Sequence, residues 1–104
     1  MTEGNKYCAD CGTLGVAFVS VNNAVFLCSE CGELHKSLDE SVSIIKSINK
    51  LTSQDILIVS LGGNEKLHEF LENYSLNSFP AKDKYESTAA RYYRANVKIN
   101  ITGS

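Results

Sequence analysis

The sequence contains no tryptophan, only one proline and no excess of basic residues. Its formal net charge is −2, whereas nucleic-acid-binding domains usually carry a clear surplus of lysine and arginine. No apolar run approaches the roughly 20 residues that a membrane-spanning helix needs, and the N-terminal MTEGNKY lacks the apolar segment of a signal peptide. We therefore expect a cytoplasmic protein that has no transmembrane segment and does not bind nucleic acid.

The rest of the composition is that of an ordinary globular protein. Apolar residues make up 43% of the chain and charged residues 21%, which argues against disorder over its whole length. The chain has 104 residues, and a typical domain has roughly 100 to 150. We therefore predict a single domain over residues 1–104.

All four cysteines lie in the first third of the sequence, as two C-x2-C pairs sixteen residues apart: Cys8, Cys11, Cys28 and Cys31. Two disulfides are improbable in a reducing cytosol, and a thioredoxin-like redox pair explains one C-x2-C but not two. Four unligated buried cysteines would not explain the clustering. The spacing is typical of a tetrathiolate zinc site, so we expect one structural Zn²⁺ with no coordination position left for water.

The residues between and after the cysteine pairs predict a small sheet. Residues 17–21 and 24–27 are rich in Val and Phe. They are separated by Asn22-Asn23, two residues that tolerate positive φ, which favours a hairpin. A helix is predicted over 29–38, and the β-branched segment 42–48 is predicted to be a third strand.

The second half of the sequence predicts helices. Thr52 or Ser53 can cap a helix that ends at Gly62-Gly63, and Asn64 can cap the next one. Residues 75–84 contain the only proline and are predicted to be a connecting loop. A last helix is expected over 85–97, with Tyr85, Ala89, Tyr92 and Tyr93 on its packing side. The predicted fold class is α+β: an antiparallel sheet of about three strands, nucleated by zinc at about 7–38, with the helical remainder at about 52–97.

The segment CADCGTLGVAFVSVNNAVFLCSECGELHKSL resembles the zinc finger and following helix of the ArfGAP domain, which stimulates GTP hydrolysis by Arf-family small GTPases. Residues 42–47 resemble the next strand of that family, Gly63-Asn64 its Gly-Asn element, and KYESTAARYYR the C-terminal helix of some members. The chain departs from the family pattern at Phe18, where tryptophan is usual, and at His68, where asparagine is common.

The resemblance implies a GTPase activator that acts in trans on the GTP-bound form of an Arf-family GTPase, in vesicle transport. Lys36 stands where the family has its catalytic arginine. The implied partner surface includes Leu34, Val42, Ile44 and Ile45. Such a protein would be cytoplasmic, with transient presence at Golgi or vesicle membranes through regions outside this sequence.

Lys36 leaves alternatives open. An arginine binds the transition-state phosphoryl oxygens with a planar pair of N–H donors, whereas lysine brings one compact charge. Lys36 is therefore compatible with weakened GTPase activation or with a catalytically inactive Arf-binding or scaffold module. A GATA-like nucleic-acid-binding zinc finger is a further alternative, because that family has a similar cysteine spacing. Lys36 could also be an exposed lysine that merely complements the helix dipole. His35 and His68 are expected to be packed or hydrogen-bonded side chains.

Overall fold

The structure is a computed structural model that describes residues 3–102 and the side chains of residues 4–98. A three-stranded antiparallel sheet has the order β2-β1-β3, with β1 at Phe18–Ser20, β2 at Val25–Leu27 and β3 at Ile45–Ser47. Val19 of the central strand pairs with Phe26 on one side and Lys46 on the other. The predicted α+β class and three-stranded sheet are confirmed.

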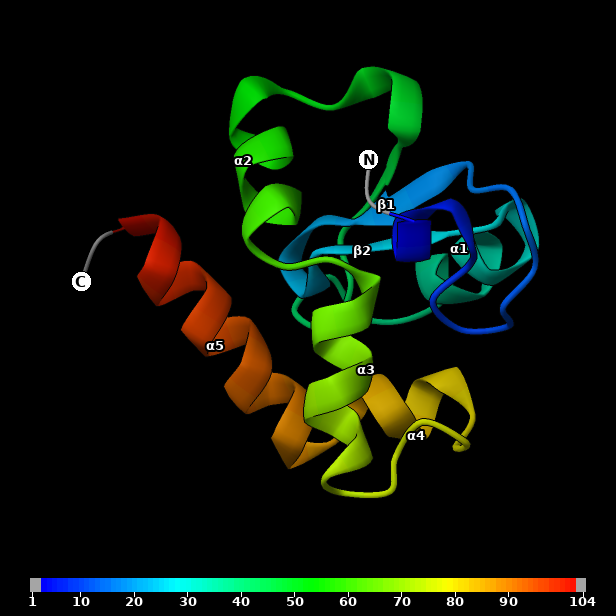
Figure 1. Cartoon of the computed structure of the whole chain (residues 1–104), viewed down its shortest axis with the longest axis vertical. Helices are drawn as coiled ribbons and strands as arrows, with labels where there is room; N and C mark the ends of the chain where they lie inside the picture. Colours follow the sequence, from blue (N-terminus) through cyan, green and yellow to red (C-terminus); the bar gives the residue numbers. More distant parts are fainter. Residues whose placement is uncertain (1–2, 103–104) are drawn as a thin grey trace.

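Five α-helices surround this sheet: α1 at Ser29–Lys36, α2 at Ser53–Leu61, α3 at Asn64–Glu72, α4 at Ala81–Glu86 and α5 at Thr88–Thr102. Three short 3-10 helices lie at Glu3–Lys6, Val21–Asn23 and Ile48–Lys50. In Figure 1, α1 lies at one end of the sheet, whereas α2 and α5 lie towards the other end. The helices α3, α4 and α5 gather below the sheet in this view.

The hydrophobic core has two parts. The larger one joins the first cysteine loop to α3, α4 and α5 through Cys8, Leu67, Tyr85 and Val97, which are all at most 7% exposed. The smaller one packs Val19, Val21, Phe26 and Val59 between the sheet and α2. The sheet is too short to bury a face by itself, so the helices supply most of the apolar cover.

Three local predictions need correction. The turn between β1 and β2 is a 3-10 helix, and the left-handed residue is Ala24 (φ 57°), not Asn22 or Asn23. The third strand begins at Ile45, so Val42 and Ile44 precede it. Residues 81–86, partly within the predicted loop 75–84, form α4, and Ser87 (ψ 157°) separates α4 from α5.

The predicted start of α2 is confirmed at Thr52, whose side chain accepts from the Asp55 N–H while the Asp55 carboxylate accepts from the Thr52 N–H. Gly62 ends the helix as predicted. The N-cap of α3, however, is Gly63, and Asn64 is its first residue. The Asn64 side chain instead accepts from the Phe26 N–H at 2.7 Å and donates to the Tyr7 carbonyl at 2.7 Å.

Candidate functional site: a four-cysteine cluster and the end of helix α1

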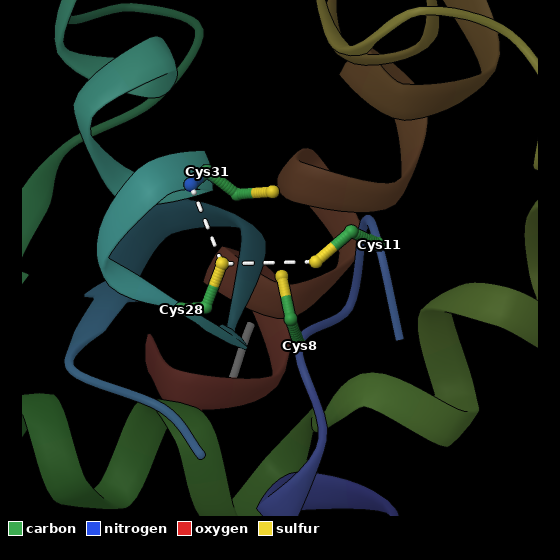
Figure 2. A group of neighbouring side chains, drawn as sticks. All are labelled: Cys8, Cys11, Cys28 and Cys31. Carbon is green, nitrogen blue, oxygen red and sulfur yellow. Dashed lines mark hydrogen bonds between the residues drawn. The ribbon is translucent and has the colours of Figure 1, made fainter. Parts of the chain in front are cut away.

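The four cysteines converge from two turns. Cys8 and Cys11 come from the loop before β1, and Cys28 and Cys31 lie at the start of α1, where Cys28 is the N-cap (Figure 2). Their four sulfur atoms all lie within 4.8 Å of one another, and Cys11 Sγ and Cys28 Sγ are 3.7 Å apart. A tetrahedral zinc with Zn–S bonds of about 2.3 Å requires sulfur separations of about 3.8 Å. The cluster therefore fits one structural zinc.

The chemistry of the thiols also suits a structural metal. Burial raises the pKa of Cys8 and of Cys31, which opposes their ionisation in the absence of a cation. Cys11 is exposed, and hydrogen bonding to Thr13 lowers its pKa to about 6. Backbone N–H groups of Asp10 and Cys31 point at the sulfurs of Cys8 and Cys28 at 3.4 and 3.5 Å. These donors favour the thiolate form that zinc binds.

A buried carboxylate lies within the first cysteine pair. Asp10 accepts hydrogen bonds from His35 Nε2 at 2.7 Å and from the Tyr85 hydroxyl at 2.6 Å, and it forms an ion pair with Lys84 Nζ at 2.9 Å. Burial by itself raises the pKa of Asp10, but the His35 hydrogen bond, the Lys84 charge and the Tyr85 hydroxyl together hold it at about 2. Asp10 thus ties the first cysteine turn to α1 and α4.

His35 continues this network into the sheet. A carboxylate can only accept, so His35 Nε2 donates to Asp10, while Nδ1 of the same ring is hydrogen-bonded to the Ser43 hydroxyl, 2.7 Å away. The hydroxyls of Ser43 and Ser20 share a hydrogen bond of 2.6 Å, and Ser20 also accepts from the Asn23 amide at 2.8 Å. His35, Ser20 and Asn23 are all 0% exposed. The expectation that His35 is a hydrogen-bonded side chain is confirmed.

The network ends on α5. Arg94 Nη1 donates to Asn23 Oδ1 at 3.0 Å and to the Tyr85 carbonyl at 2.9 Å. His68, the other histidine, lies outside the network and bonds the Ala9 carbonyl at 2.6 Å, so its packing interpretation is also confirmed. Asp10 and Arg94 were not singled out from the sequence, although a charged residue between two zinc-pair cysteines is a usable signal.

Lys36 follows the buried His35 and lies in the last turn of α1. Its side chain is 48% exposed, its Nζ lies 3.0 Å from Glu33 Oε1, and the same ammonium sits 4.6 Å from the centre of the Phe18 ring. Phe18 can approach the helix because Gly32 has no side chain: a Cβ there would lie 2.3 Å from the Phe18 ring. His35 fixes the helix end from inside, while Lys36 faces outward.

The four residues of the predicted partner surface are placed differently. Leu34 on α1 is 62% exposed and Ile44 is 41% exposed. Val42 and Ile45 are half-buried and pack against the larger core. The structure therefore leaves two apolar side chains of this set available to a partner.

Comparisons with known proteins were made for the whole chain. A family model described as "ArfGap: Putative GTPase activating protein for Arf" matches residues 1–101. The ADP-ribosylation factor GTPase-activating protein GCS1 of Saccharomyces cerevisiae is 31% identical over 96 residues, covering 89% of this chain and 27% of the relative. Stromal membrane-associated protein 1 of Homo sapiens is 35% identical over 113 residues, covering 96% of this chain and 24% of the relative. The chain thus spans about a quarter of the length of these two relatives.

Solved structures show the same fold. The crystal structure of a "putative GTPase activating protein for ADP ribosylation factor" from Cryptosporidium parvum matches with a TM-score of 0.84 at 23% identity, covering 96% of this chain and 82% of that one. The solution structure of the ArfGap domain of human RIP matches with a TM-score of 0.63 at 22% identity, covering 92% of this chain and 78% of that one. With the family model matching nearly every residue, the chain belongs to the ArfGap family.

Proposed function

We propose that this domain is a GTPase activator that acts in trans on an Arf-family small GTPase in its GTP-bound form. The observation that carries the proposal is the family match over residues 1–101. Relatives that are 31% to 33% identical are named as GTPase-activating proteins for ADP-ribosylation factor, which agrees with it. The GATA-like alternative accounts for the cysteine spacing alone, whereas the family match includes all the helices from Ser53 onward.

The ligands of the zinc would be Cys8, Cys11, Cys28 and Cys31, whose sulfurs form the cluster. Four thiolates complete a tetrahedral shell, so the metal would hold the fold and take no part in hydrolysis. Among the described residues, no helix has both the length and the apolar character needed to cross a bilayer. We place the domain in the cytoplasm, with transient presence at Golgi or vesicle membranes.

Lys36 would be the residue that faces the GTP phosphates, with reduced effect. The Lys36–Glu33 contact is an exposed pair worth about 0 to 1 kcal/mol, so it does not prevent Lys36 from turning towards a bound nucleotide. Lys36 lacks the planar guanidinium of an arginine, which accelerates GTP hydrolysis roughly 10³- to 10⁵-fold when it is supplied in trans. Lysine cannot bind two phosphoryl oxygens with a fixed fork of donors.

The partner surface would be formed by Leu34, Val42, Ile44 and Ile45, from the outer face of α1 to the start of β3. The exposure of Leu34 and Ile44 supports this placement. A catalytically inactive Arf-binding or scaffold module is the second candidate, favoured by Lys36 itself. The two candidates share a partner and differ only in the rate of hydrolysis.

A single-turnover assay with GTP-loaded Arf distinguishes them, with Arf affinity measured alongside. Lys36→Arg should raise stimulated hydrolysis by at least about tenfold, because it restores the fork at an exposed helix end. Lys36→Ala should leave Arf affinity nearly unchanged. Lys50→Arg, an exposed lysine on another element, is the matched control.

Each outcome decides between the candidates. Stimulation by the unaltered domain that increases in Lys36→Arg supports a weakened activator. Arf binding without stimulation, in both the unaltered domain and Lys36→Arg, identifies the scaffold module. Should the unaltered domain already match Lys36→Arg, lysine suffices or another residue acts, and the proposed role of Lys36 is wrong.

A further inference from the structure

A groove of about 800 Å³ lies between α5, α2 and the segment that precedes β3. Its apolar lining includes Val42, Ile44, Ile58 and Val97. This volume is within the range of about 300 to 1,000 Å³ that ligand-binding clefts occupy. In Figure 1, α2 and α5 lie away from α1, the helix whose last residue is Lys36.

One wall of the groove is a row of cations on α5. Arg91, Arg94 and Lys98 line it and follow one another at helical spacing, so their side chains share a face of the helix. Glu86 is the one acidic residue among those lining the groove, and both of its carboxylate oxygens are held by Lys82, at 3.0 and 3.2 Å. No ion pair joins the three cations to an acid in the part of the chain that the structure describes.

Electrostatic repulsion among Arg91, Arg94 and Lys98 disfavours this arrangement of three cations. Like charges three and four residues apart on a helix repel each other. Burial and the nearby charge of Arg91 lower the pKa of Arg94, whose guanidinium is fixed by Asn23 and the Tyr85 carbonyl. The chain as a whole is acidic, so the row is a local feature and not the result of a basic composition. A bound anion would relieve this repulsion.

We propose that the groove binds an acidic segment of a partner protein, with carboxylates on the α5 cations and apolar side chains against Val42, Ile44 and Ile58. The length of the row of cations favours a peptide over a lipid headgroup. Arg91 and Lys98 are seven residues apart, which is about 10 Å along the helix axis. A compact phosphorylated headgroup would meet only part of such a row. A chain with alternating acidic and apolar residues can meet the whole row and the apolar lining together.

This site goes beyond GTPase activation, because it requires neither Lys36 nor a nucleotide. Val42 and Ile44 also belong to the predicted Arf surface, so the two sites adjoin at the segment before β3. Arg91 and Lys98 belong to the groove alone and serve as its specific markers.

The test is a selection of random dodecapeptides on the zinc-loaded domain, followed by affinity measurements on the enriched sequences. We expect peptides with several acidic residues interspersed with apolar ones. Arg91→Glu/Lys98→Glu should weaken their binding by at least about tenfold, because it replaces attraction by repulsion at both ends of the row. Lys50→Glu/Lys66→Glu makes the same change in net charge on exposed lysines elsewhere and should have less than about a twofold effect.

A charge-reversed peptide provides the complementary arm, since lysines in place of its acidic residues should restore binding to Arg91→Glu/Lys98→Glu. Equal zinc content and circular dichroism spectra establish that both double variants fold. The proposal is overturned if no acidic and apolar consensus emerges, or if the two double variants bind the peptides equally. It is also overturned if vesicles of phosphatidylcholine and phosphatidylserine, and not the peptides, bind in an Arg91- and Lys98-dependent manner, because the occupant is then a membrane.

Discussion

Asp10→Asn should be among the most destabilising isosteric changes in this domain. The amide has the shape of the carboxylate but not its charge, and Lys84, only 3% exposed, forms its one ion pair within the described residues with Asp10. Removing one partner of a buried pair leaves the other charge uncompensated. Asparagine also presents an N–H group where one carboxylate oxygen accepted a hydrogen bond, either from His35 or from Tyr85.

The expected loss is about 3 to 5 kcal/mol of the free energy of unfolding, the usual cost of breaking a buried ion pair. Total stabilities of about 5 to 15 kcal/mol make this a large fraction. Lys84→Met should cost less, about 1 to 3 kcal/mol, because Asp10 keeps the hydrogen bonds from Tyr85 and His35.

Urea unfolding of the zinc-loaded variants measures these differences. With a slope near 1.5 kcal/mol/M, the midpoint of Asp10→Asn should fall by about 2 to 3 M. The double variant Asp10→Asn/Lys84→Met carries no unpaired charge and should recover more than half of that loss. A loss below about 1 kcal/mol for Asp10→Asn, or a double variant no more stable than it, would refute the reasoning. Zinc content, measured in parallel, shows whether the metal has been lost.

Four further predictions follow from single features of the structure. Chelation of the zinc should unfold the N-terminal part, since structural sites contribute roughly 10 to 16 kcal/mol on binding in finger peptides; metal analysis that finds folded, reduced protein without zinc would contradict this. Asn64→Ala should lower the free energy of unfolding by about 2 to 4 kcal/mol, because the buried Phe26 N–H loses its acceptor, and urea midpoints test this. Gly32→Ala should cost about 1 to 3 kcal/mol because its Cβ overlaps the Phe18 ring, and Phe18→Ala should remove most of that penalty in the double variant. Burial raises the pKa of Tyr93 to about 12, against about 10 when unfolded, so its contribution to stability is complete below pH 10 and is lost as the pH rises towards 12; Tyr93→Phe should remove the step near pH 12 from a titration of tyrosinate absorbance.

The predictable parts of the structure are those where a local pattern acts alone. The C-x2-C pairs, the Val- and Phe-rich strands and the Thr52 capping box each carry their own signal, and each was found in place. Helix α4 could have been found as well. Ser87 accepts from the Ala90 N–H as an N-cap does, which marks the start of a second helix inside the predicted single one.

The parts that could not be predicted depend on distant partners. Asn23 favours a left-handed turn in isolation, but its amide is used to bond Ser20, the Val42 carbonyl and Arg94. The residue of this turn that adopts a positive φ is Ala24 (φ 57°). Asn64 is of a residue type that often caps helices, but its side chain instead links β2 to the N-terminal segment by hydrogen bonds with Phe26 and Tyr7. Tyr92 was predicted on the packing side of the last helix, but its side chain is 60% exposed. The chain breaks at Ser87 between α4 and α5, so the buried face of α5 does not continue that of α4 and is formed by Ala90, Tyr93 and Val97.

The pairing of Asp10 with Lys84 and Tyr85 has a consequence for how the chain acquires its structure during synthesis. A ribosome that has released only the four cysteines has produced every predicted zinc ligand, yet Asp10 among them has neither its counterion nor the hydroxyl that α4 supplies. Until α4 emerges, Asp10 has only His35 of its three partners, so removing its charge from water remains costly. We therefore expect the nascent chain to capture the metal before Asp10 is fully buried, and α4 to complete the set of partners that holds this carboxylate.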